Sequence, residues 1–283
     1  MKNYQYLIAI LLLLGLTACG GTNTTSSNNS SSAAIEPTET PVAVAEANAD
    51  ASSQDQANQP AEENSGTSSV ASGNCNNEYY PVKSGAAWNY TLNSSLSGTD
   101  SFTRSILDVS NGSFTDQDAW EIGTTRTGFW SCENGNLTAL SLGGLATVST
   151  SEQTFVATSQ ESSGVTYPSV IELGTNWSQN LTISGDMELA EGMSGSATAD
   201  ATQYCTAVGE QSVTVPAGTF NAMKLNCSST ISITVNVEDI AIDPMTIESL
   251  SEVYLVRGVG MVKMVDDNEM AKSTIELTSY AIP

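Results

Sequence analysis

The sequence predicts an all-β protein: a single antiparallel meander whose sheet is strongly curved or forms a half-open barrel, preceded by a disordered tether. Three observations support this prediction. From about residue 74 onward, apolar and polar residues alternate with the period of two that is typical of strands with one buried face. Gly, Asn and Asp recur between the alternating segments, where turns need positive φ. Outside the N-terminal segment, no window of helical length shows a convincing apolar stripe.

Alternation bounded by turn residues predicts a series of strands in the segment 74–283, which has the size of one β domain. Neighbouring strands with short links pair antiparallel, and a meander of this length must curl or close to protect its edges. The expected strands lie at about 87–96, 101–109, 118–131, 136–142, 152–159, 176–189, 197–215, 219–237, 246–257, 259–265 and 270–280. The expected turns contain Gly98, Asn111-Gly112, Asn134-Gly135 and Asp266-Asp267-Asn268.

The N-terminus has the features of an export signal. Lys2 precedes the apolar run 7–14, which is too short for a comfortable membrane span, and Leu16-Thr17-Ala18-Cys19 follows. Leu-Thr-Ala-Cys resembles the lipobox of bacterial lipoproteins. This resemblance implies a signal peptide over residues 1–18 and a diacylglyceryl group on Cys19, with palmitate or a similar acyl chain on the freed amine. The alternative is a plain secretory peptide that happens to contain a cysteine.

Lipidation at Cys19 would hold the mature protein on a membrane, since several acyl chains anchor almost permanently. Gly20 stands where an Asp would be the known retention signal of enteric bacteria. We therefore expect a lipid-anchored protein of the bacterial cell envelope, with the outer membrane favoured over the inner membrane.

Residues 19–73 are expected to form the lipidated cysteine and a disordered acidic tether. After Cys19 this segment is rich in Ser, Thr, Asn and Ala, carries seven acids and has no Lys, Arg or aromatic residue. Such a composition buries too little apolar surface to offset the entropy of ordering the chain.

The expected domain, residues 74–283, carries 24 acidic and 7 basic residues. A surface this acidic repels nucleic acid and anionic lipid head groups, so no nucleic-acid partner is expected. The membrane, reached through lipid on Cys19, is the expected partner. The composition does not distinguish between an envelope protein, a glycan and a hydrophobic ligand as a further partner.

The domain contains four cysteines, Cys75, Cys132, Cys205 and Cys227. An even number in an exported chain favours disulfides, and pairing between sequence neighbours, Cys75 with Cys132 and Cys205 with Cys227, is the first expectation. Metal binding is the rival, but there is no CxxC spacing and the chain has no His.

The missing His also removes the commonest general base, so no catalytic, cofactor-binding or metal residue is predicted. Acidic groups could support glycosidic hydrolysis, but they fall at expected turns, where solvated side chains are the ordinary outcome. These groups are Asp116 with Asp118, Glu238 with Asp239, and Asp266 with Asp267 and Glu269.

The segment Tyr80–Trp88 has a loose echo in Tyr167–Trp177. Each has Tyr-Pro followed by a GxxW pattern at the start of an expected strand, where Gly makes a turn and Trp caps the sheet. The similarity reflects either an internal duplication or two unrelated segments that each lead into a strand capped by Trp.

Three segments together resemble a family of exported bacterial lipoproteins with YxPLxxGxxWxY, VPAGTF and GVGxVK motifs. They are 80–90 (YPVKSGAAWNY), 213–220 (VTVPAGTF) and 258–263 (GVGMVK). The aromatic residue that usually precedes the last motif is here Tyr254 or is replaced by Val253. The resemblance spans the domain but implies no catalytic residue.

Pro216 and Gly218 suit a tight turn between two strands. If Val215 pairs with Phe220, strict alternation places Cys205 and Cys227 on opposite faces. A disulfide between them then needs a longer loop or a bulge, for which Gly209 is the candidate.

The sequence thus favours a lipid-anchored envelope protein without catalysis that binds a protein, glycan or hydrophobic partner through a curved sheet. A structural or surface-display module is the alternative, and a carboxylate-based hydrolase is a third, less favoured hypothesis.

Overall fold

The computed structural model describes residues 75–141, 147–149, 154–188, 194–237, 240–241 and 243–283. The described residues form strands and turns, and none of them forms a helix able to span a membrane. The strands are β1 (Asn76–Asn77), β2 (Tyr80–Pro81), β3 (Ala87–Ser94), β4 (Gly98–Ser110), β5 (Ser113–Trp120), β6 (Thr125–Glu133), β7 (Asn136–Ala139), β8 (Thr147–Ser149), β9 (Thr154–Gly164), β10 (Asn176–Glu188), β11 (Ser194–Val215), β12 (Gly218–Val237), β13 (Ile240–Ala241), β14 (Met245–Val256), β15 (Gly260–Asn268) and β16 (Lys272–Ala281).

One antiparallel sheet of 14 strands contains every strand except β1 and β2. Around it the strands follow one another in chain order, and β16 returns to pair with β3. Pairing of β11 with both β10 and β12 then completes a ring, to which β7 and β13 are side branches. The predicted all-β antiparallel meander is confirmed, and it curls into a barrel that removes most of the sheet's edges.

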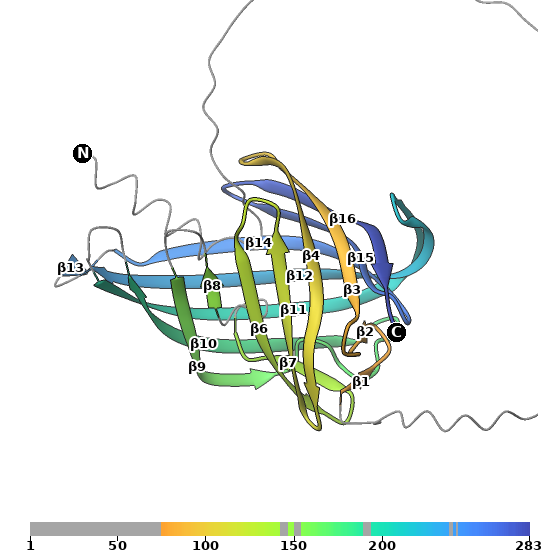
Figure 1. Ribbon diagram of the computed structural model, residues 1–283, viewed down its shortest axis with the longest axis horizontal. Coiled ribbons are helices and arrows are strands. Elements are labelled where there is room, and N and C mark those ends of the chain that lie inside the picture. The colour runs from red at the N-terminus through yellow and green to blue at the C-terminus, as the bar shows by residue number, and fades with distance from the viewer. Residues whose placement is uncertain (1–74, 142–146, 150–153, 189–193, 238–239, 242) are drawn as a thin grey trace, which may run out of the picture. The chain divides into compact units, whose positions relative to one another are not determined.

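The barrel has two unlike walls (Figure 1). Strands β3 to β6 cross the front, steeply inclined to the long strands β10, β11 and β12 behind them. We call the β4–β6 side the front wall and the β11–β15 side the back wall. Side chains along the strands point alternately inward and outward, as in the alternating burial of β5 in the front wall.

Most expected strands are present, with two corrections. The strand expected at 118–131 is two strands, β5 and β6, because Glu121–Thr124 makes a turn in which Trp120 N–H donates to Thr124 O at 2.9 Å. The turn expected at Asp266–Asn268 is wrong, because these residues continue β15 and the chain reverses after them. The short strands β1, β2, β8 and β13 were not predicted, since pieces of two or three residues show no period.

Disulfides join Cys75 to Cys132, with 4.9 Å between their Cα atoms, and Cys205 to Cys227, with 4.1 Å. Both are pairings between sequence neighbours. Cys205 lies directly opposite Cys227 because β11 has a bulge between Ala207 and Gly209. The bulge expected at Gly209 is confirmed, and its φ of 129° is one that residues other than Gly rarely adopt.

The Pro-Ala-Gly segment is the corner between β11 and β12, as its turn chemistry predicts. The expected pairing of Val215 with Phe220 is wrong: Val215 pairs with Gly218, so the turn is tighter than expected. At the tip, the N–H of Ala217 donates to Leu277 O of β16 at 3.0 Å. The corner therefore ties the hairpin to a neighbouring part of the barrel.

A layer of aromatic side chains fills one region of the interior. The ring of Tyr80 lies 5.6 Å from that of Phe114, 5.3 Å from that of Trp130 and 5.4 Å from that of Tyr167. The indole N–H of Trp88 donates to Val259 O at 2.6 Å. Side chains from all three motif segments belong to this hydrophobic core. The motifs therefore consist of residues that pack together where strands meet turns.

Candidate ligand-binding cavity

The barrel contains a partly open cavity of about 210 Å³ between its two walls. This volume is below the roughly 300 to 1,000 Å³ of typical pockets for drug-sized ligands. Its lining mixes apolar and polar side chains. The lining includes the polar or charged residues Arg104, Arg126, Ser141, Thr166, Gln179, Gln203, Ser229, Ser251 and Asp266, and the apolar residues Trp130, Leu181, Ala201, Cys205, Ile231 and Met264.

The front wall holds a buried charge cluster of two arginines and one aspartate. Asp118 pairs across the sheet with Arg104 on one side and with Arg126 on the other, so all three side chains point inward. Nε and NH2 of Arg104 donate to the two carboxylate oxygens of Asp118 at 2.7 and 2.9 Å, and Arg126 donates to Oδ2. The side chain of Asp118 is 2 % exposed. The cluster therefore stays ionised only because every member has a partner.

The pKa values of this cluster follow from its pairing. Burial by itself raises the pKa of Asp118, but the two guanidiniums and their hydrogen bonds outweigh burial and hold it below its ordinary value. Burial likewise lowers the pKa of Arg104, and Asp118 more than offsets this, so the pKa of Arg104 is raised. Asp118 is thus a fixed anion, unsuited to donating a proton.

A second buried carboxylate, Asp116, lies two residues along β5 and accepts a hydrogen bond from the Tyr80 hydroxyl at 2.7 Å. Burial, followed by the charge of Asp116, raises the pKa of Tyr80. Tyr80 and Asp116 thus form a second buried polar pair beside the charge cluster.

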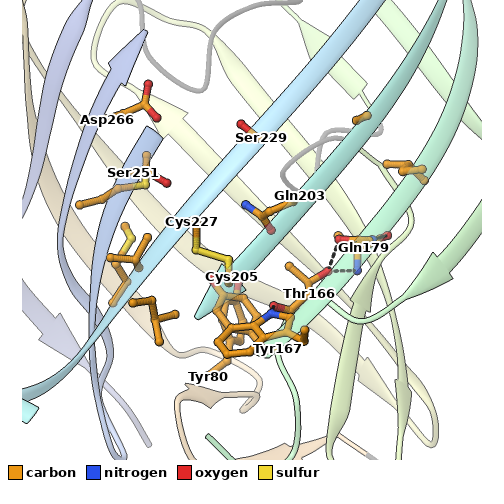
Figure 2. A pocket seen from close by; sticks show the side chains of 18 of the residues that line it. Tyr80, Thr166, Tyr167, Gln179, Gln203, Cys205, Cys227, Ser229, Ser251 and Asp266 are labelled. Atoms are coloured by element: carbon orange, nitrogen blue, oxygen red, sulfur yellow. Dashed lines mark hydrogen bonds between the residues drawn. A yellow bond between two sulfur atoms is a disulfide. The ribbon is translucent and has the colours of Figure 1, made fainter. Parts of the chain in front are cut away.

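The back wall carries a row of polar side chains that we call the polar belt: Gln203, Ser229, Ser251 and Asp266. Gln203 pairs with Ser229, and Ser251 pairs with Asp266 in the next pair of strands. Ser251 lies diagonal to Ser229, since its own partner is Cys227. Figure 2 shows these four side chains following one another across the wall.

Apolar layers lie on both sides of the polar belt. Two residues along β11 from Gln203, Cys205 belongs to one hydrophobic cluster, and Ala201 in the other direction packs against a different one. On β12 the corresponding neighbours of Ser229 are Cys227 and Ile231. The belt therefore interrupts what would otherwise be a continuous apolar wall.

Two glutamines that face each other across β10 and β11 differ in their hydrogen bonds. Gln179 is buried, donates to Ala139 O at 2.7 Å and accepts from the Thr166 hydroxyl at 2.6 Å. Its register partner Gln203 makes no side-chain hydrogen bond to another described residue, and Ser229 likewise makes none (Figure 2). The side chains of Gln203 and Ser229 are thus left for water or a ligand, whereas Asp266 accepts hydrogen bonds from Ser249 and Asn268.

Two further lining groups are buried without a partner among the described residues: Nε1 of Trp130 and Oγ of Ser141. Trp130 is 4 % exposed. A buried N–H donor without an acceptor costs about 1 to 3 kcal/mol, so such groups mark places where a ligand or water completes the structure.

The residues singled out from the sequence fall in different places. Cys19, Glu238 and Asp239 lie outside the described residues. The Cys205–Cys227 disulfide lines the cavity (Figure 2), whereas Cys75–Cys132 does not. Among the described residues, no group of three or more Cys, Asp or Glu side chains is arranged to hold a metal ion.

The expectation that the acids lie in solvated turns is wrong for Asp116, Asp118 and Asp266, all of which are buried in strands. Glu269 follows β15 and is exposed, as expected. The sequence contained a signal for the first two: Phe114, Asp116, Asp118 and Trp120 alternate, which places both acids on the aromatic face. No signal identified the polar belt, because Gln and Ser are common in this chain.

These features define a class of protein: an antiparallel β barrel with a small internal cavity of mixed polarity. Over residues 106–280 the sequence matches the DUF3108-like family. The chain therefore belongs to the DUF3108-like family. The matched range includes the second and third motif segments and begins after the first, and no curated protein sequence matches the chain.

The solved structures to which the chain is similar are distant in sequence. A proposed exported protein with a YmcC-like fold from Bacteroides fragilis is 11% identical, with a TM-score of 0.44 over 73% of this chain and 100% of that one. A proposed lipoprotein from Parabacteroides distasonis is 13% identical, with a TM-score of 0.42 over 72% and 99%. The hypothetical lipoprotein YmcC from Escherichia coli is 8% identical, with a TM-score of 0.32 over 70% and 86%.

Proposed function

We propose that this protein is anchored in the bacterial cell envelope through lipid on Cys19 and binds a small ligand inside its barrel without catalysing a reaction. The observation that carries the binding function is the cavity, with polar groups on its wall that have no partner among the described residues. Unpaired buried polar groups are costly unless something binds them.

The anchoring part of the proposal rests on the sequence alone. Leu16–Cys19 has the lipobox pattern, and the acidic segment after it suits a flexible tether whose average reach is roughly 40 Å. Delivery to the outer membrane is favoured because Gly20 is not an inner-membrane retention residue.

A carboxylate-based hydrolase is less well supported. Such an enzyme needs two carboxyl groups facing the substrate, one of them able to give up a proton. Asp118 is held as an anion by two arginines, and neither it nor Asp116 lines the cavity. Asp266 is the one carboxylate on the described cavity wall.

Native mass spectrometry of the full chain, purified gently from its own envelope, tests the binding function. We expect a discrete added mass that disappears on unfolding. A protein that carries no extra mass, and whose cavity takes up no small molecule from envelope extracts, would instead be a structural or surface-display module.

Fractionation of cells tests the anchor. Wild-type protein should sediment with membranes, and Cys19→Ala should appear soluble and without lipid, because the thiol that carries the diacylglyceryl group is gone. A matched variant at a disulfide cysteine, Cys75→Ala, should remain in the membrane fraction. If Cys19→Ala stays membrane-bound, the anchor assignment is wrong.

A further inference from the structure

The ligand's chemistry can be derived from the cavity, given the proposed binding function on which this inference rests. The charges around the cavity balance. The two arginines of the front wall are paired with Asp118, and the back wall adds the carboxylate of Asp266. The domain as a whole is strongly acidic. Neither the cavity nor the field around it therefore favours an anionic ligand.

The hydrogen-bonding groups on the two walls also restrict the ligand. Arg126 uses one of its nitrogens on Asp118, so its remaining N–H groups make the front wall a source of donors. The belt offers both donors and acceptors through Gln203 and Ser229. A ligand that fits both walls must accept and donate hydrogen bonds on opposite sides, as hydroxyl groups do.

The shape and the volume of the cavity also restrict the ligand. An acyl chain would have to cross the polar belt, and its methylene groups would then cover Gln203 and Ser229 without replacing their hydrogen bonds to water. The volume of about 210 Å³ suits one compact ring. Apolar side chains such as Leu181, Ile231 and Met264 can contact the C–H groups of such a ring, and indoles such as that of Trp130 provide aromatic surface.

From these three arguments we infer that the cavity binds an uncharged, hydroxyl-rich ring, namely a single sugar unit of a saccharide. The polar belt and the N–H groups of Arg126 hold its hydroxyls from opposite walls. The apolar layers on both sides of the belt contact the faces of the ring.

Isothermal titration calorimetry of the full chain, freed of any bound ligand, tests this inference with glucose, galactose, mannose and N-acetylglucosamine as probes, and with dodecanoate as an acyl-chain probe. We expect at least one sugar to bind, and dodecanoate not to bind. Ser229→Ala should raise the Kd of that sugar about 5-fold, the effect of one lost hydrogen bond between neutral groups. Ser228→Ala, one residue away on the exposed face of the same strand, should leave the Kd unchanged.

Gln203→Leu is the second variant, and it should weaken sugar binding at least as much because it removes a donor and an acceptor. Binding of dodecanoate without any sugar would overturn the sugar assignment while leaving a ligand-binding protein. Binding of a sugar that neither Ser229→Ala nor Gln203→Leu weakens would overturn the assignment to this cavity. If neither probe class binds and native mass spectrometry finds no added mass, the proposed function fails as well.

Discussion

The two walls of the barrel both present polar side chains to the interior, but they differ in how those side chains are satisfied. On the front wall, both oxygens of Asp118 accept hydrogen bonds from arginines of the flanking strands. On the back wall, Gln203 and Ser229 make no side-chain hydrogen bond to another described residue and face the cavity.

This difference separates two uses of buried polarity. A charge cluster whose members are paired supports the fold, and it is costly to disturb because any unpaired member is a buried ion. A half-buried polar side chain without a protein partner, such as Gln203 or Ser229, can stay hydrated, so its removal has little effect on stability. The front wall should therefore respond to mutation through stability, and the back wall through binding.

The largest effect is expected from Asp118→Asn. This change leaves the guanidiniums of Arg104 and Arg126 buried without a carboxylate, so the free energy of unfolding should fall by about 3 to 5 kcal/mol. Urea denaturation measures it. The control is Asp267→Asn: Asp267 pairs with Lys272 at 3.2 Å in an exposed ion pair and should lose less than about 1 kcal/mol. Equal losses of stability in the two variants would contradict the inference that the paired charges of the front wall support the fold.

The pH dependence of stability also tests whether the paired carboxylate of Asp118 stabilises the fold. Because the pKa of Asp118 is lowered by folding, its ionised form stabilises the native state above the ordinary value of 3.8, and this contribution is lost as the pH falls through the lower folded pKa. The stability difference between wild type and Asp118→Asn should therefore narrow below about pH 3.8. Thermal unfolding across this range is the measurement, and a constant difference would contradict the assignment.

The smallest effect should appear in a comparison of two neighbouring glutamines. Gln179→Leu removes both hydrogen bonds of a buried amide and should cost about 1 to 3 kcal/mol, since Ala139 O loses its donor from Gln179. Gln203→Leu, at the register partner, should change stability by less than about 1 kcal/mol in either direction. The denaturant midpoints of the two variants and of the wild type measure these changes in stability. Equal costs would show that Gln203 supports folding as strongly as Gln179 does, which would contradict a binding role for the polar belt.

Much of the fold could be predicted because strand alternation is a local property of the chain. The boundaries of β10, β12 and β14 differ from their expected ranges by one residue at most. The bulge at Gly209 could be inferred as well, since two cysteines that must meet constrain the register of their strands.

The cavity could not be predicted in the same way. Whether Asp116 and Asp118 lie in a turn or in a strand depends on where β5 begins, and it begins at Ser113, directly after the expected Asn111-Gly112 turn and several residues before the strand expected at 118–131. Asp266 was likewise expected in a turn, but its strand, β15, extends further than the Asp-Asp-Asn signal indicated.

By itself the sequence determined the class of fold, the chain order of the strands and the position of the hairpin between β11 and β12, because each depends on neighbouring residues. Only the tertiary structure decided that the front wall faces the polar belt across a cavity. That arrangement depends on the closure of the ring between β11 and β12 and on the registers of all the strands between the two walls. These registers accumulate bulges and shifts that no single segment of the chain reveals.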